Sequence, residues 1–351
     1  MWSLSVPDTS LRKVRPSGEI EGKESRMSKK PQKILVNGYG WTGSTAMVQM
    51  LSEYCSIGVV PNEFDDFRVP GGIGDAIRQK NSGEGVQSGT SVRFQNMKRY
   101  LLPFLVRGLV PDFFWPVSAR GGSFNRRDAY ATVLNYIREY FFYEECKKQI
   151  SRAADEDEVF RAASEWIESI VALYGRESDF IVFDQPVIFD CFTEYWSDVF
   201  SGFKMILVAR NPLDQMGTIL RDGLHLIEAP NWSVRFVYGR DRYVNRPLEF
   251  FMETTMQRYQ YIVSAYENLG SSNMLVVRFE SLVNSYHETK EIIEDFLDIN
   301  PTTHATPQTQ FRPIDSRARI TARDMLCERS LAKARGMQDR YDEMLQLTNA
   351  I

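Results

Sequence analysis

The sequence predicts an α/β fold, a three-layer sandwich in which helices cover both faces of a central parallel sheet of about five strands. Short apolar segments with the character of buried strands fall near residues 33–38, 57–60, 180–184, 204–209 and 274–279. Long segments with helical spacing separate them. Parallel strands buried on both faces show such continuous apolar runs, and the helices between them act as crossovers.

Helices are expected directly after Ser44 and in seven further segments of the chain. These segments are about 91–107, 125–150, 157–174, 212–224, 247–269, 285–298 and 318–346. The block from about 84 to 175 shows no strand signal and is rich in aromatic residues. We interpret it as a large helical insertion that covers a substrate-binding site. It belongs to a single domain that spans residues 31–351.

The first 30 residues are polar and mix proline, serine, glycine and charge. They contain no apolar core of a secretory signal, and their composition predicts a disordered N-terminal extension. Either Met1 or Met27 can be the natural start of the chain.

A glycine-rich turn follows the first predicted strand and leads into a helix that begins with two hydroxyl residues. The turn and the helix start read Gly38-Tyr39-Gly40-Trp41-Thr42-Gly43-Ser44-Thr45. Glycines let several backbone N–H groups point inward, and a helix N-terminus adds a partial positive charge. The segment therefore predicts a phosphate-binding loop.

Three nucleotide ligands compete for this loop. Gly38 and Gly43 have the spacing of a Walker P-loop, but Ser44 stands where the lysine that reaches the β- and γ-phosphates belongs. A 5′-phosphosulfate has no γ-phosphate and does not require that lysine. Backbone N–H groups together with Thr42, Ser44 and Thr45 can supply its hydrogen-bond donors.

The third ligand is a dinucleotide. Gly38, Gly40 and Gly43 match the spacing G-x-G-x-x-G, and Glu63 lies about twenty residues further on, where an acid binds the ribose. Glu63 follows Pro61, however, and we expect it beyond the end of its strand. An NAD(P)-dependent oxidoreductase thus stays open as an alternative.

A second motif begins where the 204–209 strand ends: Arg210, then Asp214 four residues on and Thr218 eight residues on. Pro212 suits the first position of a helix, and a guanidinium at such a corner suits bidentate phosphate binding. Here the chain resembles the sulfotransferases that use 3′-phosphoadenosine 5′-phosphosulfate (PAPS). The resemblance implies that Arg210 and Thr218 hold the 3′-phosphate.

A third fragment, Arg278-Phe-Glu280-Ser-Leu, resembles a late strand and turn of many sulfotransferases. The resemblance covers residues 33–60 and 180–299 in pieces. It implies a P-loop NTPase-like fold, PAPS as co-substrate, no metal, and a hydroxyl or amine acceptor on a saccharide or small metabolite. It also implies that the 5′-phosphosulfate lies on Gly40, Trp41, Thr42, Gly43, Ser44 and Thr45.

The chain departs from the family at Trp41, which occupies the position of a lysine or arginine that stabilises charge on the leaving oxygen. An indole cannot do so. Another segment then supplies the cation, or the chain is a sulfotransferase-like binding module without turnover. The candidate cations are Arg93, Lys98, Arg126, Arg127, Arg312, Arg317 and Arg319.

The general base is a carboxylate in this interpretation. Asp184 ends the 180–184 strand, near the position where many family members have a histidine. Glu63 follows the second strand, as a glutamate does in the heparan-type members. A carboxylate within hydrogen-bond reach can remove the proton of an acceptor hydroxyl, and the sequence leaves both residues as candidates.

The charge, hydropathy and cysteine content of the chain limit its possible binding partners and its cellular location. A formal net charge of −4 argues against general binding to nucleic acid. No apolar run reaches the length of a membrane span. The four cysteines form no C-x-x-C pair, which suggests reduced thiols and a cytoplasmic protein without a metal site. The oligomeric state stays open.

Overall fold

A computed structural model provides the fold. It describes residues 30–38, 42–64, 66–67, 71–83, 85–86, 94, 126–175, 178–186, 196–218, 247–303, 313 and 328–351. The chain divides into two units, residues 1–30 and residues 31–351. The architecture below is that of the second unit.

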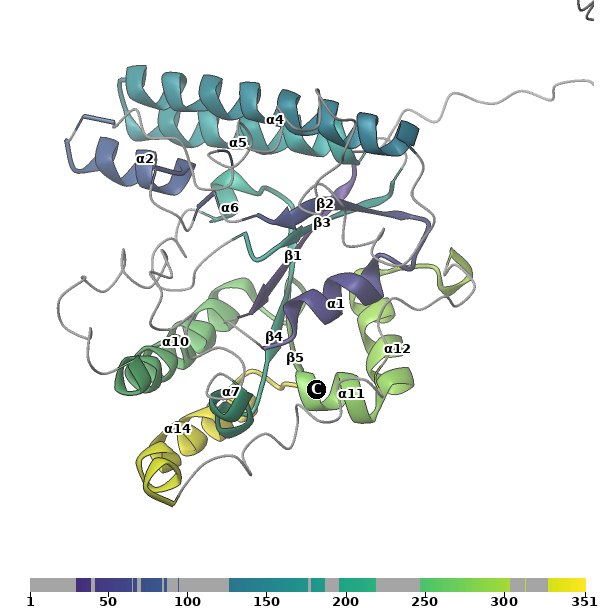
Figure 1. Ribbon diagram of the computed structural model, residues 1–351, viewed down its shortest axis with the longest axis vertical. Helices are drawn as coiled ribbons and strands as arrows, with labels where there is room; N and C mark the ends of the chain where they lie inside the picture. Colours follow the sequence, from purple (N-terminus) through teal and green to yellow (C-terminus); the bar gives the residue numbers. More distant parts are fainter. Residues whose placement is uncertain are drawn as a thin grey trace, which may run out of the picture. The chain divides into compact units, whose positions relative to one another are not determined.

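Five strands form one sheet in which every neighbouring pair is parallel (Figure 1). They are β1 (Gln32–Gly38), β2 (Ile57–Glu63), β3 (Phe180–Asp184), β4 (Lys204–Ala209) and β5 (Met274–Arg278), and their order in the sheet is β2-β3-β1-β4-β5. The predicted α/β fold with a parallel five-stranded sheet is confirmed.

Strand residues alternate between two hydrophobic cores, one on each face of the sheet. In β1, Leu35 belongs to one core, whereas Ile34 and Val36 belong to the other, and all three side chains are fully buried. Because both faces are covered, each strand needs apolar residues at consecutive positions. This explains why the strands were readable as continuous apolar runs.

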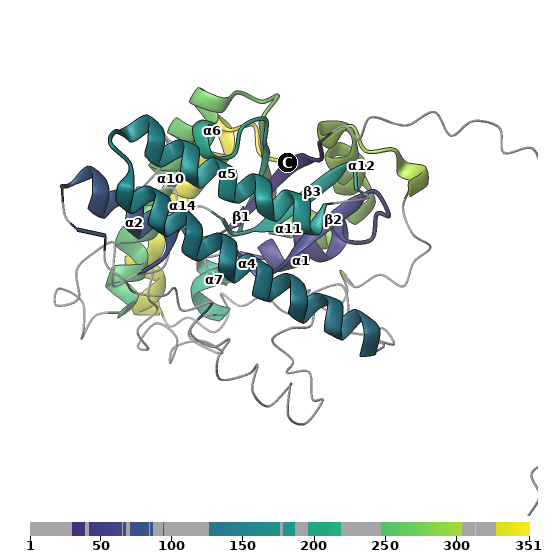
Figure 2. The ribbon, with the colours of Figure 1, turned by 90° about the horizontal axis from the view of Figure 1, so that it is seen from above.

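Helices form the two outer layers (Figures 1 and 2). One face carries α1 (Ser44–Leu51), α11 (Phe279–Asn284) and α12 (Tyr286–Leu297). The opposite face carries α2 (Ile73–Asn81), α4 (Arg126–Arg152), α5 (Glu156–Tyr174), α6 (Trp196–Val199), α10 (Pro247–Leu269) and α14 (Glu328–Leu347). Two short helices, α7 (Pro212–Thr218) and the 3₁₀ turn Pro301–Thr303, complete the described elements.

Four of the five strands begin and end within a residue or so of their predicted positions, and β2 is the exception. It runs through Pro61 to Glu63, so the expectation that Glu63 lies beyond its strand is wrong. Two features permit this extension. The register shifts between Val59 and Glu63, and β2 is an edge strand, where a proline without an N–H is tolerated.

Most predicted helices are present, and three of the described α-helices, namely α2, α6 and α11, were not predicted. The segments at 157–174 and 247–269 coincide with α5 and α10. The predicted helix at 91–107 lies outside the described residues except for Phe94, and so does the part of the 212–224 helix after Thr218. α2 and α6 are short, and neither has enough turns to show a helical period.

The strand order creates one crevice at the carboxyl edge of the sheet. From β1 the chain crosses through α1 toward β2, whereas from β4 it crosses through α7 and α10 toward β5 on the other face. Adjacent strands whose connections diverge in this way leave a gap at their carboxyl ends, where α/β proteins bind ligands. In this chain the gap lies between β1 and β4.

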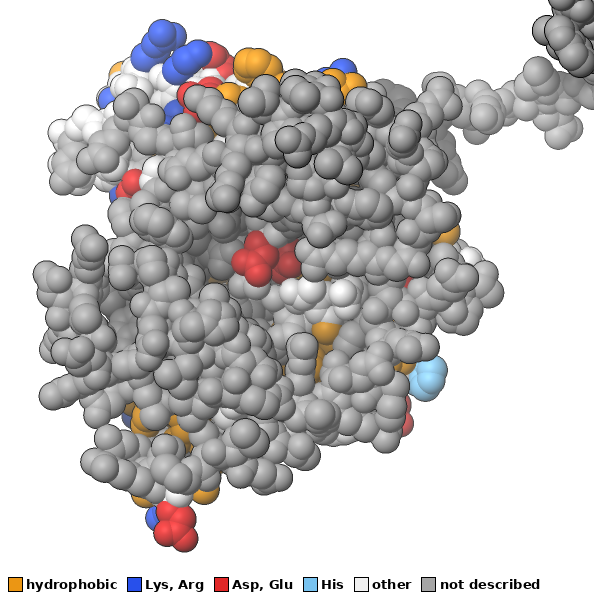
Figure 3. Space-filling view, in the orientation of Figure 1, with side chains coloured by type: hydrophobic (Ala, Val, Ile, Leu, Met, Phe, Trp, Pro, Cys, Tyr) orange, Lys and Arg blue, Asp and Glu red, His pale blue; other side chains and the backbone are white. Residues whose placement is uncertain are grey.

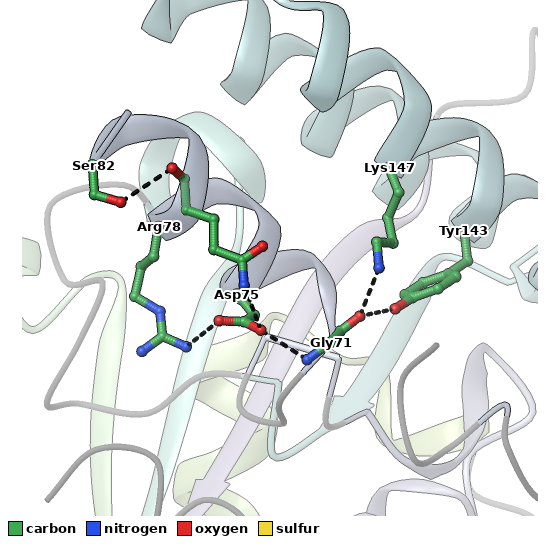
Figure 4. A network of polar contacts seen from close by, with 7 residues as sticks. Gly71, Asp75, Arg78, Ser82, Tyr143 and Lys147 are labelled. Atoms are coloured by element: carbon green, nitrogen blue, oxygen red, sulfur yellow. Dashed lines mark hydrogen bonds and ion pairs between the residues drawn. The ribbon is translucent and has the colours of Figure 1, made fainter. Parts of the chain in front are cut away.

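A polar network fixes α2 against α4 (Figure 4). The Gly71 carbonyl accepts hydrogen bonds from the Tyr143 hydroxyl and from the Lys147 ammonium, the latter at 3.1 Å. Asp75 accepts from Gly71 N at 2.9 Å and from Arg78 at 3.2 Å. Burial lowers the pKa of Lys147. The start of α2, soon after the carboxyl end of β2, is thereby tied to the helical layer above it.

The aromatic core between the sheet and α5 should contribute much of the stability. Phe64 is fully buried, and its ring centroid lies 5.2 Å from that of Trp166 and 5.0 Å from that of Phe183. We expect Phe64→Ala to lower the free energy of unfolding by about 3–5 kcal/mol, measured by urea denaturation. Phe141→Ala is the control, because that side chain is 64% exposed and its loss should cost within about 0.5 kcal/mol. Equal losses would contradict this assignment of the core.

Candidate functional site

The loop after β1 reaches the crevice from one side. Gly43 precedes α1 in the left-handed conformation, with a φ of 101°, and α1 has neither a side-chain cap nor an acidic residue in its first turn. Thr42 and Ser44 are buried, and Thr45 is half-buried. Gly40 and Trp41, which were also predicted to bind the ligand, lie outside the described residues. The described part has the open helix N-terminus that an anion requires.

Two glycines of this loop are required by close packing. A Cβ atom at Gly38 would overlap the Thr42 hydroxyl, and a Cβ atom at Gly43 would overlap the Phe279 ring. At Gly43 the positive φ adds a second reason, because it is unfavourable for any residue with a side chain. The loop geometry therefore depends on these two positions.

The predicted arginine–threonine pair forms the other side of the crevice. Arg210 follows β4 and is 2% exposed. Its Nη2 atom donates to Thr218 Oγ1 at 2.6 Å and to the Asp214 carbonyl at 3.2 Å. Thr218 in turn donates to that carbonyl at 2.9 Å. Two turns of α7 bring residues eight positions apart into direct contact, as the spacing predicted.

A second ring of residues fixes this corner, and sequence reasoning gave it no role. Asn211 Oδ1 accepts from Leu213 N at 3.0 Å and so caps α7, while Asn211 N donates to Glu280 Oε1 at 2.8 Å. Burial raises the pKa of Glu280, an effect that the Asn211 N–H and the Arg210 guanidinium oppose. The Arg210 guanidinium also lies 5.4 Å above the Phe279 ring centroid.

Both sides line one pocket beside the carboxyl end of β4. Its polar lining consists of Thr42 from the loop, Arg210 and Gln215 from the second motif, and Thr255, Arg258 and Tyr259 from α10. The first three belong to segments that the sequence singled out. The α10 residues belong to no motif, and helical spacing alone could not connect them with the loop.

The two candidate bases are neighbours. Glu63 ends β2 and Asp184 ends β3, and the two residues are register partners. Gln185 donates to Glu63 Oε1 at 3.3 Å. Asp184 is 2% exposed, whereas Glu63 is exposed. Figure 3 shows acidic side chains at the centre of the face that is turned to the viewer.

The backbone is strained directly beside these carboxylates. Gln185 has a φ of 53°, which is rare for a residue other than glycine. Its N–H donates to the Val36 carbonyl of β1 at 2.7 Å, and the Phe64 N–H donates to the Asp184 carbonyl at 2.7 Å. These bonds hold the end of β3 between its two neighbours and fix where Asp184 leaves the sheet.

The strand order argues against the dinucleotide interpretation. An acid that binds the ribose ends the strand next to β1 in a Rossmann fold. In this chain β3 lies between β1 and β2, so Glu63 ends a strand two spacings from β1, about 10 Å away. Asp184, on the adjacent strand, is in register with Val36.

None of the seven candidate cations from the sequence has a described side chain. Arg93, Lys98, Arg312, Arg317 and Arg319 lie outside the described residues. Arg126 and Arg127 are in the first turn of α4, but their side chains are not described.

No family model and no curated protein matches the chain. Solved structures that resemble it include three sulfotransferases or sulfotransferase domains. The sulfotransferase domain of the curacin biosynthetic pathway is 12% identical, with 92% of this chain and 99% of that one covered and a TM-score of 0.46. The sulfotransferase STF9 of Mycobacterium avium is 12% identical, with 92% and 78% covered and a TM-score of 0.42. The sulfotransferase domain of the Synechococcus PCC 7002 olefin synthase is 14% identical, with 91% and 93% covered and a TM-score of 0.40. TM-scores below 0.5 establish no family.

The described residues contain no group of three His, Cys, Asp or Glu side chains that could hold a metal ion. None of the helices they form has both the length and the apolar character to cross a membrane.

Gly43→Ala should destabilise the protein through both the strained φ and the overlap with Phe279. We expect a loss of about 3–5 kcal/mol in the free energy of unfolding, measured by chemical denaturation. Gly83→Ala is the matched control, because Gly83 also has a positive φ, 75°, but has open space around it. The control should cost about 1–2 kcal/mol. Equal losses would mean that the contact with Phe279 contributes nothing.

Proposed function

We propose that this protein transfers a sulfuryl group from PAPS to a hydroxyl or amine acceptor on a saccharide or small metabolite. The observation that carries the proposal is the buried hydrogen-bonded pair of Arg210 and Thr218. Arg210 follows the carboxyl end of β4 and lines the same pocket as Thr42 of the glycine loop. The crevice thus offers two anion-binding elements to one ligand.

The two elements suit the two anionic ends of the donor. Thr42, Ser44, Thr45 and the N–H groups at the start of α1 would hold the 5′-phosphosulfate by directed hydrogen bonds. The Arg210 guanidinium, with the Thr218 hydroxyl beside it, would hold the 3′-phosphate. Gly40 and Trp41 complete the loop in this proposal.

The carboxylates suit the acceptor side. Asp184 or Glu63 would take the proton of the acceptor as its oxygen or nitrogen bonds to sulfur. The bond from sulfur to the bridging phosphate oxygen breaks in the same step, and 3′-phosphoadenosine 5′-phosphate leaves with that oxygen. The protein would contribute positioning and charge stabilisation, as in phosphoryl transfer.

A binding module without turnover is the second candidate. Trp41 favours it, because the loop position that carries a cation in sulfotransferases is an indole here. The two candidates predict the same nucleotide binding and differ only in turnover. A donor-hydrolysis assay that compares the wild type with Trp41→Lys separates them, since a gain of hydrolysis in the variant alone would identify an inactive module.

Nucleotide selectivity tests the proposed anion-binding elements. In calorimetric titrations we expect 3′-phosphoadenosine 5′-phosphate to bind more tightly than ADP, and NADH to bind weakly or not at all. Because charged hydrogen bonds contribute about 1.5–3 kcal/mol, Arg210→Ala should remove most of the preference for the 3′-phosphate. Thr218→Ala should reduce it less.

Exposed Arg335 supplies the matched control, and Arg335→Gln should retain the selectivity. Circular dichroism of each variant separates a binding defect from unfolding. A preference for NADH, or unchanged 3′-phosphate selectivity in both Arg210→Ala and Thr218→Ala, would overturn the proposal.

Substitution of each candidate carboxylate identifies the base. Asp184→Asn and Glu63→Gln keep the size of each side chain but remove its basicity. We expect the variant that lacks the true base to lose about 10²–10⁴-fold in the rate of PAPS hydrolysis, with nucleotide affinity unchanged. The other variant should stay near the wild-type rate. Full activity in both variants would exclude a carboxylate base from this pair.

A further inference from the structure

The glycine loop has too little positive charge for a phosphosulfate. No lysine or arginine occurs between Ile34 and Leu51, so within this segment only the α1 N-terminus contributes, with roughly half an elementary charge. Arg210 does not correct this, because the proposed function assigns it to the 3′-phosphate at the other end of the donor. An anion with charge on both its phosphate and its sulfate group requires a further cation.

α10 presents such a cation to the same pocket. Arg258 lines it together with Thr42 and Arg210, and it is half-buried on a helix whose neighbouring residue, Tyr259, is 6% exposed and packs in the core. The buried neighbours Thr255 and Tyr259 hold this part of α10 against the core, and Arg258 lines the pocket from it.

Two hydroxyl groups of α10 supply a second, independent observation. Thr255 is 5% exposed and also lines the pocket, yet its Oγ1 atom has no hydrogen-bond partner among the described residues. The same holds for the Tyr259 hydroxyl, and burial raises its pKa so that it stays protonated. Buried hydroxyls without a partner are rare and indicate an absent ligand or water.

We propose that Thr255, Arg258 and Tyr259 form the third wall of the anion site, with Arg258 supplying the cation that Trp41 cannot. The ligand it takes is a phosphosulfate or a pyrophosphate-like anion on the glycine loop. Arg258 was not among the cations that the sequence suggested. The assignment rests on the proposed function, because it places the 5′ end of the donor beside Thr42.

Calorimetry with nucleotide fragments tests the role of Arg258. Arg258→Gln should lower the affinities for 3′-phosphoadenosine 5′-phosphate and for 5′-AMP by the same factor, about 10–100-fold. The affinity for 3′-AMP should stay unchanged. The ratio of the affinity for 3′-phosphoadenosine 5′-phosphate to the affinity for 5′-AMP should stay the same in Arg258→Gln. Arg210→Ala should reduce that ratio. The control Arg335→Gln should alter none of these affinities. Unchanged affinity for 5′-AMP in Arg258→Gln would overturn the assignment.

Thr255→Val tests the hydroxyl with two opposing readouts. Removing a buried hydroxyl without a partner should leave the urea midpoint unchanged or raise it, while 3′-phosphoadenosine 5′-phosphate binds several-fold more weakly. Thr348→Val is the matched control, because Thr348 is equally buried but donates to the Met344 carbonyl at 2.8 Å. It should lose stability and keep its affinity. Unchanged affinity in Thr255→Val would remove this hydroxyl from the site.

Inorganic pyrophosphate separates this inference from the proposed function. Suppose that the wild type binds pyrophosphate but not 3′-phosphoadenosine 5′-phosphate, and that Arg258→Gln lowers the affinity for pyrophosphate. The anion site formed by Thr255, Arg258 and Tyr259 is then supported, and the sulfotransferase proposal fails. If 3′-phosphoadenosine 5′-phosphate binds and Arg258→Gln leaves its affinity unchanged, the proposed function is supported and the role of Arg258 in the anion site fails. Binding of neither ligand overturns both.

Discussion

The packing of the Phe279 ring connects the two halves of the candidate site. One edge of the ring lies where a Cβ atom of Gly43 would be, and the Arg210 guanidinium lies 5.4 Å above its centroid. The glycine loop, the arginine corner and the end of β5 therefore share one contact. A shift of either anion-binding element would have to displace this ring, which the dense interior of a protein resists.

Sheet register explains why these segments meet. Gly38, the last residue of β1, pairs with Val208 in β4, so the loop that follows β1 and the Arg210 corner leave the sheet at the same level. On the other side of β1, Val36 pairs with Asp184, which in turn pairs with Glu63. Along the carboxyl edge, the two candidate bases thus lie on β2 and β3, and the proposed anion-binding groups follow β1 and β4.

The parts of the site that sequence could predict are local. The glycine loop joins two adjacent elements, and the spacing from Arg210 to Thr218 is two turns of one helix, so both follow from neighbours in the chain. Strand order, the partner of Asn211 on α11 and the approach of α10 to Thr42 depend on residues between 69 and 217 positions apart, and no local pattern encodes them. The predicted end of β2 was wrong for a related reason. Pro61 would terminate a central strand but is tolerated in an edge strand, and the position of β2 in the sheet depends on distant pairing.

The distribution of charge suggests that binding energy and selectivity come from different groups. Arg210 is buried against the Thr218 hydroxyl, the Asp214 carbonyl and the Phe279 ring, and Glu280 lies close enough to moderate its charge. A guanidinium held so rigidly discriminates by geometry, because its planar fork fits one oxyanion arrangement. The proposed arrangement assigns further attraction for the ligand to the α1 N-terminus and to Arg258 on α10. In such an arrangement, a cation on a neighbouring helix can compensate for the indole of Trp41 without any change in the strands or in the arginine corner.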